Sequence, residues 1–184
     1  MIAAIFGDIP VFLIGALAAA AYAPERYTKD VDYFVVADRY GEAQTRLLTA
    51  GWKQTRTLTF PNAALGLFGS AWRAHDGRPE IDLITSEQEW AREALAAPIS
   101  RDTKGERVIP LAYLILMKLD SARAIDQGDL ARILGRLSPE QMDDVINIVV
   151  RHYRDPSTAE DLRQYHEIGK WEYETESTSH RESE

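Results

Sequence analysis

The chain has 184 residues and a formal net charge of −8, which suits one compact domain or a core with a small subdomain. It contains no cysteine, which excludes a disulfide scaffold, a cysteine–zinc site and a thiol nucleophile. The acidic balance argues against broad nucleic-acid binding, because such binding needs lysine and arginine to displace counterions, but it leaves room for a local basic groove. The longest apolar run, residues 9–23, is too short to span a bilayer, so we expect a cytoplasmic protein without a membrane segment.

Strands and helices are expected to alternate in the first part of the chain. Apolar and β-branched residues predict the strands, helical spacing of apolar residues predicts the helices, and glycine or proline ends most of them. In chain order, we expect a strand at 9–15, a short helix at 16–23, a strand at 29–36, a helix at 38–51 and a strand at 52–60. The small, glycine-containing residues 62–70 are expected to form a loop.

A β-hairpin and a capped helix are expected next. Residues 70–85 surround Asp76-Gly77, a dipeptide that favours a hairpin turn, and residues 80–85 would be the second strand. Ser86 is followed three residues later by Glu89, which predicts a capping box at the start of a helix over 86–96.

The last third of the chain is predicted to be helical. Residues 111–137 indicate one long helix, or two with a break at Gly128, and Ser138-Pro139 is typical of the start of the next helix. A short final helix is expected at 158–168. These patterns predict an α/β (α+β) fold with a mixed sheet and a helical C-terminal part. The expected organisation is a core over 1–105, a helical subdomain over 106–168 and a disordered acidic tail over 169–184.

Three acidic residues lie in strand-like apolar segments. Asp30 and Asp32, in TKDVDYFVV, are two residues apart and therefore point to the same face of a strand. Asp82 lies between Ile81 and Leu83 in EIDLIT, and it would reach the other two acids if the two strands pair. Like charges held together repel and lose hydration, so cations must compensate. Hard divalent ions such as Mg²⁺ prefer oxygen ligands, and two such ions are the usual device for in-line phosphoryl displacement.

In this order, the motifs resemble those of nucleotidyltransferases of the polymerase-β-like superfamily. Gly15 comes first, Asp30-Val31-Asp32 follows after a gap, and Asp82 lies in a later strand. The segment RYTKDVDYFV resembles the minimal or AbiEii-like branch of that superfamily. The helical segment MKLDSARAIDQGDLARIL is similar too, through the residues Lys118, Arg123, Asp126 and Asp129. The resemblance covers roughly residues 9–135.

The resemblance implies a nucleotidyltransferase-like mixed sheet flanked by helices, and an enzyme that moves an NMP from an NTP onto a hydroxyl acceptor. It implies that Asp30, Asp32 and Asp82 are catalytic and hold two Mg²⁺ or Mn²⁺ ions. Nucleotide binding is implied for a further set of residues: Gly15, Ala16, Lys29, Lys118 and Arg123. The acceptor would be RNA, a protein side chain or a small molecule. The branch also suggests a toxin–antitoxin pair, and therefore a partner protein.

Position 16 departs from the family pattern. The family has glycine or serine there, which helps to hold the nucleotide phosphates, whereas Ala16 offers only its backbone N–H. Two alternatives therefore stay open. One is a catalytically degenerate module that binds nucleotide or a partner protein, as an antitoxin would; the intact acids oppose it. The other is a nucleic-acid-binding regulator that uses the C-terminal helices; the acidic net charge opposes it.

Several of these residues also have ordinary structural explanations. Asp30 and Asp32 can be solvated at the start of a strand, with Arg26 and Lys29 as partners. Lys118 can be a lysine whose stem lies along an apolar helix. For the other polar residues of that region a solvated face with local ion pairs suffices: Arg123, Asp126 and Asp129.

Overall fold

The computed structural model describes residues 2–61 and 63–181, with side chains up to residue 175. These residues form a mixed α+β fold with one seven-stranded sheet and seven α-helices, which confirms the predicted fold class. The chain divides into two compact units. The N-terminal unit comprises residues 1–21 and 25–110, and the C-terminal unit comprises residues 22–24 and 111–184.

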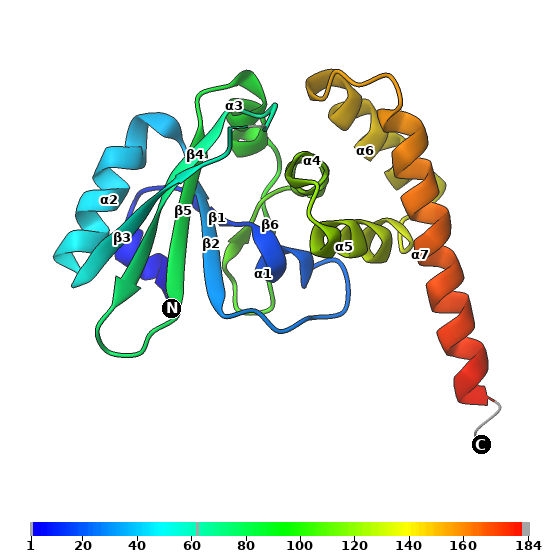
Figure 1. Ribbon diagram of the computed structural model, residues 1–184, viewed down its shortest axis with the longest axis horizontal. Coiled ribbons are helices and arrows are strands. Elements are labelled where there is room, and N and C mark those ends of the chain that lie inside the picture. Colours follow the sequence, from blue (N-terminus) through cyan, green and yellow to red (C-terminus); the bar gives the residue numbers. More distant parts are fainter. Residues whose placement is uncertain (1, 62, 182–184) are drawn as a thin grey trace. The chain divides into compact units, whose positions relative to one another are not determined.

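The N-terminal unit is built on the sheet (Figure 1). Across the sheet, the strands follow in the order β3 (Trp52–Thr59), β4 (Leu67–Ala74), β5 (Glu80–Ser86), β2 (Asp30–Val35), β1 (Val11–Leu13), β7 (Arg107–Val108) and β6 (Ser100–Arg101). The pairs β2–β5 and β1–β7 are parallel, and the other four pairs are antiparallel. All five strands expected from the sequence are present, and the two-residue strands β6 and β7 are additions to them.

One face of the sheet is buried under a 3-10 helix, η1 (Ile2–Phe6), and α2 (Tyr40–Thr49). The ring of Phe6 packs edge-on against Tyr33 of β2, with 5.4 Å between the ring centroids. The hydroxyl of Tyr40 is hydrogen-bonded to Ser70 Oγ of β4 at 2.7 Å. This face therefore forms one side of the core of the N-terminal unit, because every second residue of the strands points toward it.

The opposite face is apolar at one end and acidic at the other. Phe34 and Ile84 are register partners on β2 and β5, and the Trp90 ring of α3 (Glu89–Ala96) lies 5.3 Å from the ring of Phe34. Two residues nearer the start of both strands, the same face carries Asp32 and Asp82. The acids thus continue a row of core positions, which is an unfavourable place for charge unless a ligand or a partner compensates.

The C-terminal unit is helical, with α4 (Leu111–Ser121), α5 (Ala124–Leu134), α6 (Pro139–His152) and α7 (Thr158–Arg181). The capped start of α6 is confirmed, because Ser138 and Gln141 form a reciprocal capping box and Pro139 is the first helical residue. The helices α5 and α7 cross closely: a Cβ on Gly169 would overlap with the backbone at Ala131 and Gly135. In the part of the chain that the structure describes, no helix combines the length and the apolar character needed to cross a membrane.

Several element boundaries differ from those expected, and three of them have a clear structural reason or consequence. Residues 67–70 belong to β4 instead of a loop. Ser86 ends β5 instead of capping α3, because its hydroxyl donates to the Leu65 carbonyl at 2.8 Å and accepts from the Gln88 N–H. The predicted capping box with Glu89 is therefore wrong. The break between α4 and α5 lies at Ala122, whose φ is +52°, while Gly128 lies inside α5.

The expected domain limits also differ from the two compact units. Residues 106–110, expected in the helical subdomain, belong to the N-terminal unit and include β7. Helix α7 continues past residue 168 because its next turns pack on α5: the Tyr173 hydroxyl donates to the Arg132 carbonyl at 3.0 Å, and the Arg136 guanidinium lies over the Tyr173 ring. Residues 169–175 therefore lie in helix α7, and residues 182–184 lie outside the described part.

Candidate functional site

The register of β2 and β5 brings the predicted acids together. In this parallel pair Asp32 lies beside Asp82, and Asp30 lies beside Glu80. Asp30 shares the face of Asp32, because the two are separated by one residue in a strand. The sequence left the pairing of strand 80–85 with strand 29–36 as a condition, and the structure meets it. The acidic face also gains Glu80 as a fourth member.

Gly15 lies directly against this acidic face. It begins the five-residue helix α1 (Gly15–Ala19) with φ of +62°, and a Cβ at this position would overlap with the Asp32 carboxylate. The neighbouring Ile14 N–H donates to the Asp32 carbonyl at 3.0 Å. Both the side chain and the backbone of Asp32 are thus fitted to the turn at the start of α1, and only glycine suits that turn. Ala16 follows in α1 and is 6% exposed.

The acids differ in exposure. Along β2, Asp32 is partly buried and Asp30, at the start of the strand, is exposed. On β5, Asp82 has 20% of its side chain exposed. Glu80 is engaged by an ion pair with Arg73 of β4. Arg56 of β3 brings its guanidinium to within 3.9 Å of Asp82 Oδ2. The sequence did not single out Arg56 as a residue of this site, because its approach to Asp82 depends on strand register.

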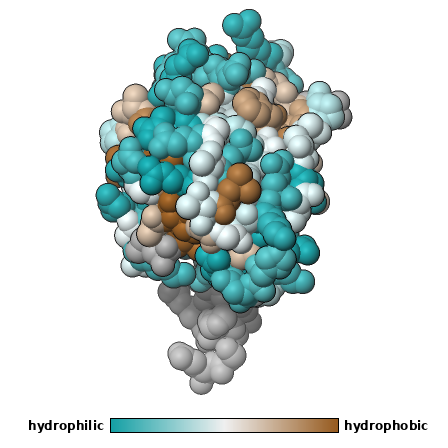
Figure 2. All heavy atoms as spheres, turned by 90° about the vertical axis from the view of Figure 1, so that its left-hand side faces the viewer, coloured by the Kyte–Doolittle hydropathy of each residue, from teal (hydrophilic) through white to brown (hydrophobic). Residues whose placement is uncertain are grey.

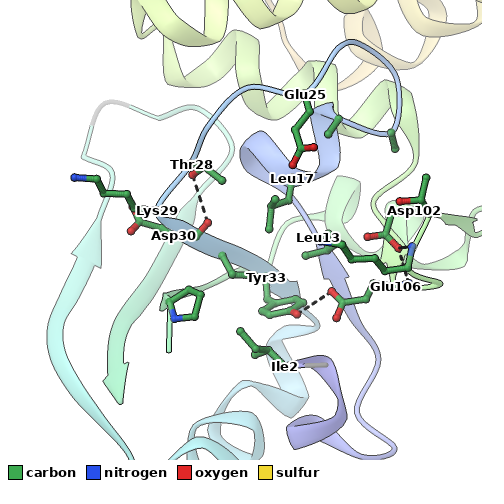
Figure 3. A pocket seen from close by; sticks show the side chains of 16 residues that line it. Ile2, Leu13, Leu17, Glu25, Thr28, Lys29, Asp30, Tyr33, Asp102 and Glu106 are labelled. Carbon is green, nitrogen blue, oxygen red and sulfur yellow. Dashed lines mark hydrogen bonds between the residues drawn. The ribbon is translucent and has the colours of Figure 1, made fainter. Parts of the chain in front are cut away.

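Asp30 and Lys29 also line a cavity of about 670 Å³ (Figure 3). Its walls come from η1, β1, α1, β2 and residues 102–106, and its lining does not include Asp32 or Asp82. The Tyr33 hydroxyl points at Glu106 across the cavity wall and donates to Glu106 Oε2 at 3.0 Å. Burial, with the nearby charge of Glu106, raises the pKa of Tyr33, so this hydroxyl stays protonated at neutral pH.

Lys118 lies in a buried network of charges within the C-terminal unit. Its Nζ donates to Asp126 Oδ1 at 3.0 Å and to Asp129 Oδ2 at 2.6 Å, and all three side chains are at most 5% exposed. Asp126 Oδ2 accepts further hydrogen bonds from Ser121 Oγ and Arg123 Nε, both at 2.6 Å. Burial alone would raise the pKa of Asp126, but these hydrogen bonds and the charge of Lys118 together lower it.

This network gives Lys118 and Arg123 a structural explanation. The Lys118 ammonium is enclosed between two carboxylates, as a buried charge must be paired, and Arg123 bonds to Asp126 three residues along α5. It also gives Asp126 and Asp129 a role that the sequence had left open. The break at Ala122 turns the chain so that α5 can return its carboxylates to a lysine of α4.

The acidic face of β2 and β5 suits a divalent cation that arrives with a phosphate ligand. Among the described residues, no group of three or more His, Asp or Glu is arranged to hold a metal ion by itself. Mg²⁺, however, is usually held by one or two carboxylates and completes its octahedron with substrate phosphates and water. Two adjacent, partly exposed carboxylates, Asp32 and Asp82, match that donor set.

No protein-family model and no curated protein matches the chain. Similar solved structures include JHP933 from Helicobacter pylori, at 16% identity over 97% of this chain and 90% of that chain, with a TM-score of 0.46. A candidate nucleotidyltransferase from H. pylori has 16% identity over 91% and 88%, with a TM-score of 0.47. The antibiotic-resistance factor ANT(2'')-Ia has 16% identity over 95% and 89%, with a TM-score of 0.44. TM-scores below 0.5 assign neither a family nor an activity, so a functional assignment depends on the chain's own residues.

Proposed function

We propose that the chain is a metal-dependent nucleotidyltransferase that moves an NMP from an NTP onto a hydroxyl acceptor. One observation carries the proposal: the parallel register of β2 and β5 sets Asp32 beside Asp82, and Asp32 is fitted against the turn at Gly15. Carboxylates placed side by side repel, and these two share a face of the sheet with the apolar pair Phe34 and Ile84. A cation that enters with its nucleotide relieves this repulsion.

The residues divide the work by position. Asp32 and Asp82, with Asp30, would hold two Mg²⁺ or Mn²⁺ ions, which would neutralise phosphate charge. The turn at Gly15 and Ala16 offers backbone N–H groups to the phosphates beside the acids. Asp82 accepts the proton of the acceptor hydroxyl. The acceptor oxygen forms a bond to the α-phosphorus as the bond to the bridging oxygen breaks and pyrophosphate leaves, so positioning and charge stabilisation supply the rate.

The other residues that the resemblance implied in nucleotide binding separate into two groups. Lys29 lies beside Asp30 on the cavity wall and is proposed as a nucleotide contact. A nucleotide contact by Lys118 would require its ammonium to leave two buried carboxylates, so we propose that Lys118 and Arg123 stabilise the helical unit instead.

A label-transfer assay tests the proposal. The protein is incubated with each α-labelled NTP, Mg²⁺ or Mn²⁺, and a cell extract that supplies RNA, protein and small-molecule acceptors. Transfer by the wild type that is lost in Asp32→Asn and Asp82→Asn is expected. Asp38→Asn, which changes an exposed acid beyond the other end of β2, is the matched control and should retain transfer. The labelled species identifies the acceptor class.

The alternative of a degenerate binding module is favoured by Ala16 alone. If no NTP supports transfer by a folded protein, the transferase proposal is wrong. An Ala16→Ser variant that then gains transfer would show that the missing hydroxyl had disabled the site. Ala16 is buried, so the folding of the Ala16→Ser variant must be checked by circular dichroism.

A further inference from the structure

A row of cross-strand neighbours connects the acids to the edge of the sheet. Asp32 of β2 lies beside Asp82 of β5, Asp82 lies beside Ala71 of β4, and Ala71 lies beside Arg56 of β3. Residues directly opposite each other share a face of the sheet. Because Ala71 has only a methyl group, the Arg56 side chain can extend over it toward Asp82, and the guanidinium comes within 3.9 Å of Asp82 Oδ2.

A β-bulge is what turns Arg56 to this face. The pairing of β3 with β4 runs from Lys53 with Arg73 to Gln54 with Trp72, and then shifts so that Arg56 pairs with Ala71. Without the shift, Thr55 would occupy the acidic face and Arg56 would point to the other side. Bulges on edge strands beside active sites commonly re-aim a side chain in this way.

The Arg56–Asp82 pair contributes little as a structural ion pair. The Arg56 side chain is 65% exposed and its approach to Asp82 is close to the limit for an ion pair. Exposed pairs of this kind contribute between zero and about 1 kcal/mol to stability. Figure 2 shows that the side of the N-terminal unit with α2 and β3 is mostly hydrophilic, with apolar residues in a few patches. The exposure of the Arg56 side chain and its long ion pair leave the guanidinium available to a ligand.

We infer that Arg56 binds the triphosphate of the nucleotide at the Asp32–Asp82 site. This inference rests on the proposed function. Ligand oxygens of Mg²⁺ lie about 2.0–2.1 Å from the ion. A phosphate oxygen that shares an ion with Asp82 therefore lies within about 4 Å of the carboxylate. A guanidinium that already comes within 3.9 Å of Asp82 is therefore placed close to the position such a phosphate would take. Arginine also binds phosphate through paired, charge-assisted hydrogen bonds.

Arg73 provides a natural comparison on the same face. Its side chain is 64% exposed, close to the value for Arg56, but it forms a tight two-nitrogen contact with Glu80 in the next row. Glu80 is the register partner of Asp30, one row away from the Asp32–Asp82 pair. Arg73 is thus occupied by its own carboxylate, and it is not expected to contact the nucleotide.

Calorimetric titration with each NTP and the corresponding NMP in Mg²⁺, without acceptor, tests the inference. Arg56→Ala should weaken binding of the preferred NTP about tenfold or more and leave NMP binding unchanged, because charge-assisted hydrogen bonds to the outer phosphates are lost. Arg56→Lys should recover part of the affinity, and Arg73→Ala should bind the NTP within about twofold of the wild type.

The outcomes separate this inference from the proposed function. Unchanged NTP affinity in Arg56→Ala, or an equal loss for NTP and NMP, overturns the role of Arg56 even if label transfer occurs. If Arg56→Ala selectively loses affinity for the NTP but the wild type shows no label transfer, the role of Arg56 stands and the transferase proposal is overturned. If the wild type binds none of the NTPs at millimolar concentration, both are overturned.

Discussion

Two groups of carboxylates in this protein carry charge in opposite ways. In the C-terminal unit, Asp126 and Asp129 are buried and share the ammonium of Lys118 at hydrogen-bond distance. On the sheet of the N-terminal unit, Asp32 and Asp82 are partly exposed, and Arg56 stops 3.9 Å from Asp82. The helical group carries its own buried cation, whereas the sheet group faces a largely exposed one. The first group therefore fits a role in stability, and the second fits the cation-binding role that we propose for it.

The largest expected effect is on the helical group. Lys118→Ala removes the buried ammonium that Asp126 and Asp129 share, which should cost about 3–5 kcal/mol of unfolding free energy. Urea denaturation followed by circular dichroism measures this cost. Lys170→Ala, which removes a half-exposed lysine from an ion pair with Glu167, should cost less than about 1 kcal/mol.

A rescue variant sharpens this prediction. Neutralising the whole network with Lys118→Met, Asp126→Asn and Asp129→Asn should restore much of the lost stability, because no uncompensated charge stays buried. A cost below about 1 kcal/mol for Lys118→Ala alone would show that the network is not the structural element we describe.

The next effect concerns the sheet group. Gly15→Ala combines an unfavourable positive φ with overlap against the Asp32 carboxylate, so it should destabilise the protein and displace Asp32. Gly77→Ala has a similar φ of +79° but no atom within 4 Å of the added Cβ, so it isolates the conformational cost, about 1–2 kcal/mol. We expect Gly15→Ala to cost at least about 1 kcal/mol more than Gly77→Ala in urea denaturation. Equal costs would mean that Asp32 is not held against the turn.

Acid should distinguish the helical group through Asp126. Its pKa is lowered in the folded protein, whereas in the unfolded chain it stays near the ordinary value of about 3.9. Its contribution is therefore complete above that value and is lost as the pH falls through the lower folded pKa. Urea denaturation at pH values from 7 to 3 should show a shallower loss of stability below about pH 4 in Asp126→Asn than in the wild type. The exposed Asp143→Asn should follow the wild-type curve, and parallel curves for all three proteins would contradict the assignment.

The smallest expected effect is the change in stability caused by Arg56→Ala. The free energy of unfolding of this variant should lie within about 1 kcal/mol of the wild-type value, because the side chain is largely exposed and its ion pair is long. Thermal unfolding in the absence of nucleotide measures this. A larger loss would place Arg56 with the structural ion pairs and remove the contrast with Lys118.

Among the features of this protein, the acidic face of β2 and β5 was the one that the sequence predicted best. The spacing of Asp30 and Asp32 places both on one face of any strand, and the apolar flanks of Asp82 indicated a second strand that could pair with the first. These inferences follow from alternation, which is a local property. The network around Lys118 was not predicted, because it depends on a helix break at Ala122 that carries no glycine or proline signal.

Register is the part that local patterns could not supply. Asp82 and Glu80 both lie on the acidic face, and only the pairing shows that Asp82 is the neighbour of Asp32. Arg56 reaches the site because a β-bulge shifts β3 by one residue relative to β4. The sequence of residues 53–59 contains no glycine or proline that would have indicated this bulge. Ser86 illustrates a local signal that the tertiary structure overrides. Its hydroxyl could have capped a helix, but it donates to the Leu65 carbonyl instead.

The pairing of β2 with β5 also bears on how the site arises during folding. Asp32 and Asp82 are 50 positions apart, and the hairpin of β4 and β5 forms from neighbouring residues, whereas β2 must close a long loop to join β5. Loop closure costs entropy before any contact rewards it, so long-range parallel pairing is slow compared with hairpin formation. Neither hairpin nor strand alone can hold the two carboxylates side by side. The acidic face is therefore a product of the completed sheet, and a folding intermediate that lacks the β2–β5 pairing would carry the acids without the site.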